Sequence, residues 1–356
     1  MKFALSDEGT DDDMKPVGVA VVGAGYWGPN LVRNVLSCPM TDLRWVCDLN
    51  EERARSAVGP RSTVAVTRSL DQVLSDPGVE AVAVATPPET HFEIGMACLE
   101  SAKHVFMEKP LASSVAEGEK LVDVAAQNGS ILMCDHTYCY TPAVRKIREL
   151  IQSGAMGDIQ YFDSVRVNLG LIQSDVDVFW DLAPHDLSIL DFILPDGHQP
   201  EAVAAQGADP IGAGQACVGY LTIRLSAGAI AHIHVNWLSP TKIRTTIIGG
   251  SDRMLVWDDL HPSQRLSMYD KGVDLSASLS GEARRESLIS YRVGDMISPV
   301  LPEVEALQGS IQELATAIRE ARQPLTDGHA GLRVLRMLEA ASISLRSEGA
   351  AVPIVL

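Results

Sequence analysis

"VAVVGAGYWGPN", residues 19–30, contains the turn that decides the fold of this chain. Gly23, Gly25 and Gly28 give the spacing G-x-G-x-x-G after an apolar, β-branched run. The first glycine permits a tight turn, the second lets a pyrophosphate approach the backbone, and the third lets a helix pack on the strand. The N-terminus of that helix adds positive potential. The stretch therefore predicts a strand, a phosphate-binding turn and a helix that together bind a dinucleotide.

An acidic residue supports this interpretation. Asp48 ends the next predicted strand, 20 residues after Gly28, where a carboxylate hydrogen-bonds the adenosine ribose. A carboxylate there repels a 2′-phosphate, so NAD is expected as the cofactor rather than NADP. Arg53 and Arg55 lie just downstream and offer the alternative of a 2′-phosphate site, although exposed helix charges are the simpler interpretation.

The composition excludes several classes of function. With 29 Lys and Arg against 46 Asp and Glu, the net charge of −17 repels phosphate backbones, so no nucleic-acid partner is expected. Residues 1–16 are acidic and read as a disordered tail, and no apolar run is long enough to span a bilayer. Six cysteines without a CxxC pair indicate reduced core thiols. We expect a cytoplasmic protein with no membrane partner.

Two different sequence patterns divide the chain into two parts. From Val17 to about residue 138, short β-branched runs alternate with helical patterns, which is typical of a doubly wound parallel sheet. Residues 17–138 are therefore predicted to form an NAD-binding Rossmann domain, and residues 139–356 a second α/β domain. A helix over 330–348 closes the second domain or packs back on the first.

Period-two alternation marks the second domain as mostly antiparallel sheet. In "AIAHIHVNW", residues 229–237, one face carries Ala229, Ala231, Ile233, Val235 and Trp237, and the other carries His232, His234 and Asn236. His-x-His invites a metal site, but no third ligand accompanies it, so none is predicted.

Two strand ends in the first domain carry residues suited to a cleft. "VAVATPPETH", residues 82–91, brings Thr86 and Pro87 to the edge where doubly wound folds bind ligands. His91 either joins them at the cofactor or satisfies backbone groups at a helix start. "HVFMEKP", residues 104–110, ends in Glu108 and Lys109. A lysine is rarely buried unpaired, so Lys109 is expected to reach the nicotinamide, with Glu108 holding its orientation and charge.

A further pair lies in "FWDLAPHDLSIL", residues 179–190. Asp181 and His185 are four residues apart, so on a helix they share one face. An acid/base histidine oriented by a carboxylate is the sharper interpretation, and a structural pair is the alternative.

Together these motifs resemble the Gfo/Idh/MocA family of oxidoreductases. "GAGYWG", "ATPPETH", "EKPLA", "DHTYCYTPAV" and "WDLAPHDLSIL" occur in family order and at family spacing. The resemblance implies a Rossmann domain plus an α/β domain with a large open sheet for substrate binding and oligomerisation, and hence a homodimer or homotetramer. It also implies a cis bond before Pro110, a Lys109 that assists hydride transfer, and an acid/base His185 with Asp181 nearby.

The motifs and the resemblance together assign residues to the cofactor, to the substrate and to catalysis. The expected cofactor contacts are Gly23, Gly25, Tyr26, Trp27, Gly28, Asp48, Thr86, Pro87, His91, Glu108 and Lys109. The expected substrate contacts are Tyr138, Tyr140, Arg166, Asn168, Trp180 and His185, each with a structural role as the alternative. The expected catalytic residues are Lys109, His185 and Asp181.

The expected reaction is hydride transfer between NAD and a secondary hydroxyl or ketone of a sugar. "FDSVRVNLG" and "WDLAPHDLSI" look most like the branch that acts on nucleotide-linked sugars, including UDP-N-acetylglucosaminuronate 3-dehydrogenases, which favours C3. Many members carry a glycine-rich run where this chain has "DVFW", residues 177–180, so the pocket differs there. The alternatives are an inositol or free-sugar dehydrogenase, a glycosidase that uses NAD transiently, and a non-enzymatic NAD-binding regulator.

Overall fold

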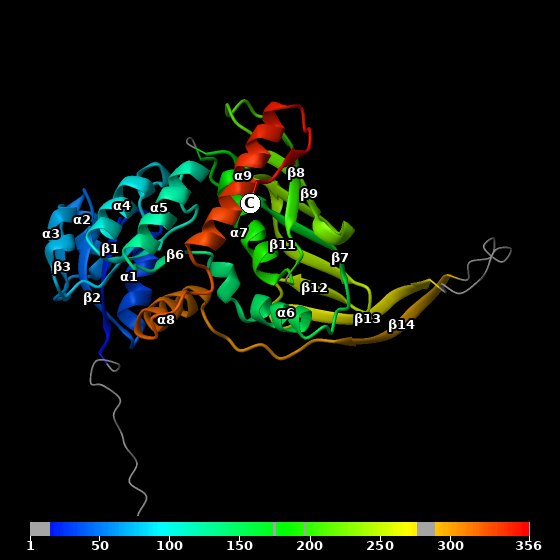
Figure 1. Cartoon of the computed structure of the whole chain (residues 1–356), viewed down its shortest axis with the longest axis horizontal. Coiled ribbons are helices and arrows are strands. Elements are labelled where there is room, and N and C mark those ends of the chain that lie inside the picture. The colour runs from blue at the N-terminus through cyan, green and yellow to red at the C-terminus, as the bar shows by residue number, and fades with distance from the viewer. Residues whose placement is uncertain (1–14, 174–175, 196, 276–288, 356) are drawn as a thin grey trace, which may run out of the picture. The chain divides into compact units, whose positions relative to one another are not determined.

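The computed structural model describes residues 15–173, 176–195, 197–275 and 289–355. Its contacts divide the chain into two compact units (Figure 1). The first unit runs to Asp135 and includes Glu305–Leu332, and the second comprises His136–Val304 and the chain from Arg333 onward. The expected disordered tail lies, but for its last two residues, outside the described residues.

The first unit contains a six-stranded sheet in the order β3-β2-β1-β4-β5-β6, with every neighbouring pair parallel. The strands are β1 (Val17–Val22), β2 (Thr41–Cys47), β3 (Ala65–Thr67), β4 (Ala81–Val84), β5 (His104–Met107) and β6 (Leu132–Cys134). The strand order reverses between β1 and β4, and ligands of such sheets bind beyond the carboxyl ends at that point. The predicted doubly wound fold is confirmed.

Helices cover both faces of this sheet (Figure 1). They are α1 (Gly28–Ser37), α2 (Glu51–Val58), α3 (Leu70–Ser75), α4 (His91–Glu100) and α5 (Val115–Gln127), and the 3₁₀ turn η1 (Pro88–Thr90) precedes α4. Side chains cap two of these helices, because Asn50 accepts hydrogen bonds at the start of α2 and Ser114 at the start of α5.

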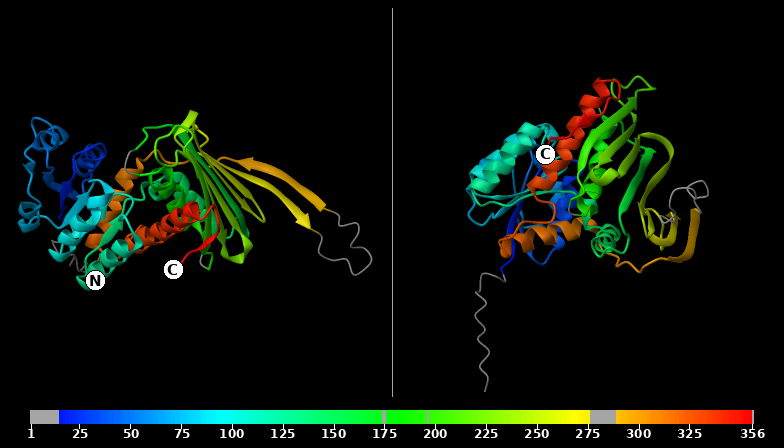
Figure 2. Two further views of the ribbon diagram at one scale, coloured as in Figure 1. Left: turned by 90° about the horizontal axis from the view of Figure 1, so that it is seen from above. Right: turned by 45° about the vertical axis from the view of Figure 1, so that its right-hand side comes forward.

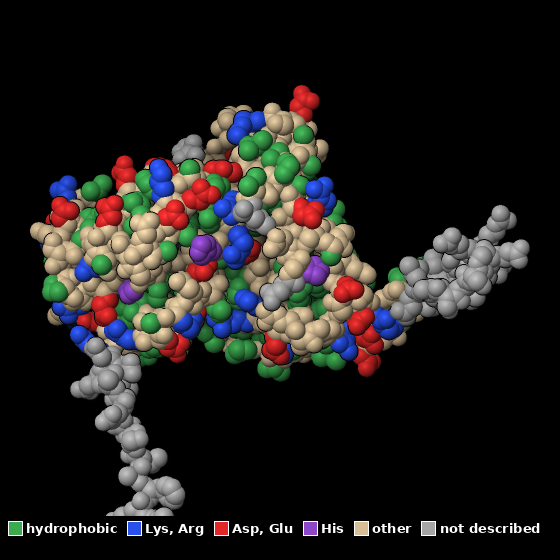
Figure 3. Space-filling view, viewed as in Figure 1, with side chains coloured by type: hydrophobic (Ala, Val, Ile, Leu, Met, Phe, Trp, Pro, Cys, Tyr) green, Lys and Arg blue, Asp and Glu red, His purple; other side chains and the backbone are tan. Residues whose placement is uncertain are grey.

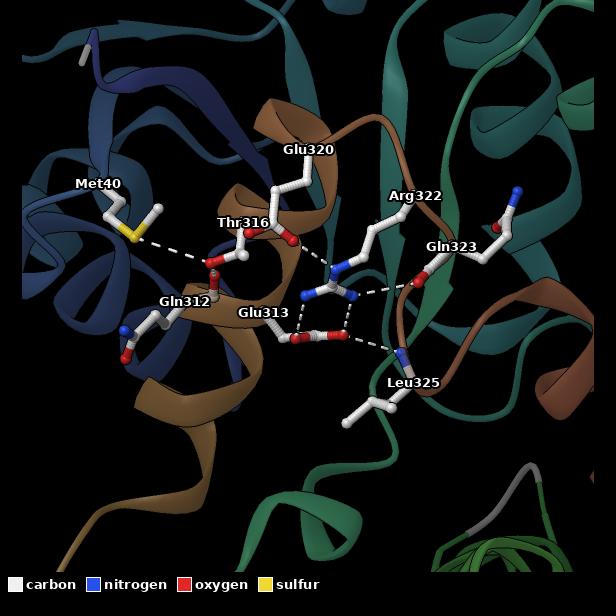
Figure 4. A network of polar contacts seen from close by, with 8 residues as sticks. All are labelled: Met40, Gln312, Glu313, Thr316, Glu320, Arg322, Gln323 and Leu325. Carbon is white, nitrogen blue, oxygen red and sulfur yellow. Dashed lines mark hydrogen bonds and ion pairs between the residues drawn. The ribbon is translucent and has the colours of Figure 1, made fainter. Parts of the chain in front are cut away.

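A segment from late in the chain, Glu305–Leu332, completes the first unit and contains α8 (Ala306–Arg319). Figure 4 shows how it is fixed internally: Arg322 donates to both carboxyl oxygens of Glu313, at 2.7 and 3.0 Å, and to Glu320. Arg319 makes a similar two-pronged contact with Glu80, and Thr326 O accepts from Cys134 N beside β6. Paired N–H donors on one carboxylate are strong and geometrically specific.

The second unit contains a nine-stranded sheet in the order β14-β13-β12-β11-β7-β10-β9-β8-β15, in which only the β7–β10 pair is parallel. The strands are β7 (Ile159–Leu169), β8 (Pro200–Ala208), β9 (Val218–Leu225), β10 (Ile230–Asn236), β11 (Leu238–Gly250), β12 (Met254–Asp258), β13 (Leu266–Leu275), β14 (Ile289–Ile297) and β15 (Val352–Pro353). The predicted large, mostly antiparallel sheet is confirmed.

One face of this sheet is packed against helices α6 (Pro142–Gln152), α7 (Val178–Ile193) and the later turns of α9 (Gly328–Arg346) (Figure 2). The second unit also contains two short 3₁₀ turns, η2 (Thr137–Tyr140) and η3 (Ser226–Gly228). The predicted alternation along β10 is confirmed, since Ala231, Ile233 and Val235 are fully buried. On the opposite face, called the open face below, no helix of the second unit lies within the described ranges, and Tyr220, Ile230, Ile243 and Ile247 are exposed.

Three further properties concern the surface charge, the cysteine thiols and the length of the helices. Acidic and basic side chains are interspersed over the face shown in Figure 3. All six cysteines are free and buried. None of the helices in the described ranges has both the length and the apolar content that a bilayer crossing requires.

Candidate active site

The glycine-rich turn between β1 and α1 has the shape that a dinucleotide requires. Gly23 has a φ of +97°, and a Cβ there would lie 2.6 Å from Ala85 O. A Cβ on Gly28 would lie 2.1 Å from Gly23 O, whereas one on Gly25 would meet no atom within 4 Å. Two glycines are thus required by packing, and Gly25 leaves the backbone open to a phosphate. The turn fits NAD.

Asp48 lies directly after β2 and ties this turn to the sheet. Its Oδ2 accepts a hydrogen bond from Ala24 N at 2.6 Å, and its Oδ1 accepts one from Asn50 N at 2.7 Å. A carboxylate has about four acceptor sites, so capacity remains for ribose hydroxyls. Nearby, Tyr26 is 90% exposed, and the buried Trp27 Nε1 has no hydrogen-bond partner among the described residues.

His91 is placed differently from the expected cofactor contact. It is fully buried, with Nδ1 2.8 Å from Pro110 O and Nε2 2.9 Å from Thr86 O. Burial lowers the pKa of His91, although the two carbonyls oppose that effect. Both ring nitrogens therefore face backbone carbonyls, and His91 holds the loop at Thr86 to the loop at Pro110. Pro87 is exposed beside them.

The strand ends of β5 and β6 place two acids together. Glu108 directly follows β5, and Asp135 directly follows β6, with Asp135 N donating to Met107 O at 2.7 Å. The bond between Lys109 and Pro110 is cis, as the resemblance implied. Burial and the adjacent, hydrogen-bonded Asp135 raise the pKa of Glu108 well above its ordinary value, while Lys109 opposes the shift. A hydrogen bond between two carboxyl groups requires a proton on one of them, which agrees with the raised pKa of Glu108.

Asp135 was missed in the sequence, although a signal for it was present. The rule that placed Lys109 at the carboxyl end of a parallel strand applies equally to the residue after "ILMC". Together, Glu108 and Asp135 supply one negative charge beside Lys109.

This carboxyl pair gives a pH-dependent prediction. Because the folded-state pKa of Glu108 is raised, the folded chain keeps a proton that the unfolded chain releases above about pH 4.3. Stability should therefore fall as the pH rises from there towards the folded-state pKa. Glu108→Gln keeps the shape and removes this titration, so its unfolding free energy should change less between about pH 5 and 8. Urea unfolding at several pH values checks this, with the exposed Glu89→Gln as control; an equal pH slope in wild type and Glu108→Gln would contradict it.

In the second unit, α7 carries the expected acid/base residues. Asp177 caps the helix by accepting from Phe179 N and Trp180 N. Asp181 Oδ2 accepts from Trp237 Nε1 at 3.0 Å, and the His185 ring meets the Tyr138 ring edge-on, with centroids 5.0 Å apart.

The remaining expected substrate contacts divide into two groups. Trp180 donates its indole N–H to Ser342 Oγ at 2.9 Å, and Tyr140 is buried with Arg145 over its ring, contacts that agree with the structural alternative for both. Tyr138 and Asn168 are half-buried.

Arg166 is held by a carboxylate that the sequence analysis did not identify. Its Nε donates to Asp186 Oδ2 at 2.7 Å and its Nη2 to Asp186 Oδ1 at 3.1 Å, and the guanidinium carbon lies 4.3 Å from the Tyr138 ring centroid. Burial disfavours the charged form, but Asp186 and Tyr138 outweigh it and raise the pKa of Arg166. Because Asp186 adjoins His185 on α7, this pair fixes the helix to β7. His232 and His234 instead stack on Tyr220 at the open face.

A Rossmann unit whose glycine turn fits a dinucleotide, followed by a unit with a large, mostly antiparallel sheet, is typical of NAD-binding oxidoreductases. Comparison with known families agrees. The oxidoreductase family with an NAD-binding Rossmann fold matches residues 17–136, and the GFO/IDH/MocA C-terminal domain matches residues 144–255. The chain belongs to the GFO/IDH/MocA oxidoreductase family, and NAD is its cofactor.

Several characterised relatives are dehydrogenases of sugars and cyclitols. UDP-N-acetylglucosamine 3-dehydrogenase of Acidithiobacillus ferrooxidans is 26% identical over 316 residues, which cover 88% of this chain and 93% of the relative. Myo-inositol 2-dehydrogenase of Thermotoga maritima is 26% identical over 225 residues, 60% of this chain and 67% of the relative.

Solved structures share the fold. That of the A. ferrooxidans enzyme GnnA has a TM-score of 0.78 at 24% identity and covers 94% of this chain and 99% of its own. GenD2 from gentamicin A biosynthesis, solved with NAD, has a TM-score of 0.79 at 24% identity and covers 96% and 97%.

Proposed function

We propose that this protein is an NAD-dependent sugar dehydrogenase or ketoreductase that transfers a hydride between nicotinamide and C3 of a nucleotide-linked sugar. One observation carries the proposal: the chain keeps both Lys109, at the carboxyl end of β5, and His185, on α7 one turn from Asp181. The near full-length similarity to a nucleotide-sugar 3-dehydrogenase supports the substrate class. Bound NAD supplies the hydride acceptor for oxidation.

The remaining catalytic roles belong to three side chains, those of His185, Asp181 and Lys109. His185 takes the proton of the reacting hydroxyl, a contribution typically worth about 10²–10⁴ in rate. Asp181, fixed by Trp237, orients that histidine. Lys109 stabilises the developing alkoxide, and the single negative charge of the Glu108–Asp135 pair is its counter-charge.

A panel of sugars tests the proposal. NADH formation at 340 nm should be fastest with nucleotide-linked sugars, slower with free sugars and inositols, and absent with sugars blocked at C3. Preference for an inositol would favour the cyclitol dehydrogenases. Glycosidic cleavage without net NADH would indicate the NAD-dependent glycosidase, and NAD binding without oxidation of any compound would indicate a regulator.

Asp48 predicts the choice between NAD and NADP. Its carboxylate should repel a 2′-phosphate, so the wild type is expected to use NAD. Asp48→Asn keeps one acceptor oxygen and removes the charge. We expect its KM for NAD to rise about tenfold and its kcat/KM for NADP to improve. Steady-state kinetics with both cofactors check this, with Asp42→Asn, exposed on β2, as control; an unchanged NAD to NADP ratio would refute the assignment.

Association and location complete the proposal. The open face of the nine-stranded sheet exposes Tyr220, Ile230, Ile243 and Ile247, which favours a homodimer or homotetramer. Light scattering should therefore give two or four times the chain mass of 38.3 kDa. The free, buried thiols suit the reducing cytoplasm.

A further inference from the structure

Two arginines lie directly opposite each other in the second unit. Arg166 on β7 is the register partner of Arg244 on β11, so both side chains stand on the helix-covered face. Like charges in directly opposed positions destabilise a sheet unless something offsets them. Asp186 satisfies Arg166 with two hydrogen bonds. Arg244 pairs with Asp259 at 3.5 Å, the limit of a hydrogen bond, and its side chain is 30% exposed.

Buried donors without acceptors surround the same place. Arg166 Nη1 and Trp257 Nε1 are buried and have no hydrogen-bond partner within the described ranges. Arg166 is 3% exposed and Trp257 2%. Orphaned N–H groups of this kind are rare in native proteins, and each requires an explanation.

Tyr138 joins these groups into one cluster. The Tyr138 ring centroid lies 4.3 Å from the Arg166 guanidinium carbon and 5.8 Å from that of Arg244. The same ring meets the rings of Trp257 and His185 edge-on, at 6.2 and 5.0 Å. The Tyr138 ring thus contacts both the half-exposed Arg244 and His185, the expected acid/base histidine.

The N–H donors of this cluster outnumber its acceptors, which favours an anionic ligand. Two guanidinium groups and an indole offer many N–H donors, while the carboxylate of Asp186 already accepts three hydrogen bonds and that of Asp259 lies at the limit of hydrogen-bonding distance. Guanidinium groups match the planar oxygens of carboxylates and phosphates better than any neutral group. Water could satisfy single donors, but it would not balance the second positive charge.

We propose that Arg244, backed by Arg166 and Trp257, forms an anion subsite beside His185 that selects substrates carrying acidic oxygens. This inference rests on the proposed function, because it names the substrate class of that site. The acidic oxygens belong either to a carboxylate on the sugar or to the diphosphate of a nucleotide-linked sugar.

Four compounds distinguish a sugar carboxylate from a diphosphate as the recognised anion. With NAD-loaded, full-length protein, kcat/KM is measured for glucose, glucuronate, UDP-N-acetylglucosamine and UDP-N-acetylglucosaminuronate. Arg244→Gln keeps a polar, hydrogen-bonding side chain that is shorter than arginine, and it loses the charge. We expect it to lower kcat/KM about 10–100-fold, through KM, for the compounds that carry the recognised anion, and to leave the others within about twofold. Arg244→Lys should restore part of the loss.

The pattern of losses identifies the anion. A loss confined to the two carboxylated compounds indicates a sugar carboxylate, and a loss confined to the two UDP compounds indicates the diphosphate. Arg224→Gln, an exposed arginine on β9 paired with Glu201, is the matched control and should change none of the four values.

Two results would overturn the subsite. One is an equal effect of Arg244→Gln on all four compounds, and the other is no effect on any. If the wild type oxidises none of them, the proposed function fails, and calorimetric titration of the same compounds decides the subsite alone. Binding of an anionic compound that is lost in Arg244→Gln then supports the subsite, and the absence of any anion preference overturns it.

Discussion

Replacing Lys109 with methionine is expected to lower kcat by roughly 10³-fold while the Kd for NAD changes little. Methionine keeps the length and apolar stem of lysine, so the buried strand β5 and the glycine turn should be undisturbed. What is lost is the ammonium that we propose stabilises the developing alkoxide, together with its charge beside the Glu108–Asp135 pair. Initial rates with saturating sugar and NAD measure kcat, and fluorescence titration measures NAD binding.

A matched variant guards this result against a general effect of removing a lysine. Lys120 is exposed on α5, and Lys120→Met should retain wild-type turnover. A Lys109→Met protein that keeps kcat within about threefold of wild type would remove Lys109 from the reaction.

Replacing Arg166 with methionine is expected to destabilise the protein by about 3–5 kcal/mol, because it leaves the Asp186 carboxylate buried without its partner. Side chains of this pair are 4% and 1% exposed, so solvent cannot take the place of the guanidinium. Ser164, which donates to Asp186 Oδ1 at 2.7 Å, is a single neutral donor and cannot compensate. Urea unfolding at neutral pH measures the loss.

The double variant makes this prediction sharper. Arg166→Met with Asp186→Leu removes both charges, and well-packed apolar replacements of buried ion pairs are often neutral in stability. We therefore expect the double variant to be more stable than Arg166→Met alone. The exposed pair Arg224–Glu201 is the control, since its disruption should cost at most about 1 kcal/mol. A single Arg166→Met variant as stable as the wild type would show that the pair does not fix α7 to β7.

Local pattern was sufficient for the fold class and for several strand ends. The glycine turn at Gly23 and the alternation along β10 each depend on residues close together in sequence, and both were predicted correctly. Asp135 was accessible by the same reasoning that located Lys109.

The remaining features depend on distant parts of the chain. His91 has the local context of a helix start, yet its ring partners include Pro110, 19 residues later. The opposition of Arg166 and Arg244 depends on the register between β7 and β11, which no local pattern specifies. Likewise, the apolar spacing of α8 does not show that this late segment packs in the first unit rather than the second.

We propose that this chain moves a hydride from C3 of a nucleotide-linked sugar to NAD. The most direct test uses UDP-N-acetylglucosamine and UDP-N-acetylglucosaminuronate, each deuterated at C3, with mass spectrometry of the reduced cofactor. We expect the NADH formed to carry one deuterium and the product to be a 3-keto sugar. Unlabelled NADH, or no reduced cofactor from either sugar, would contradict it.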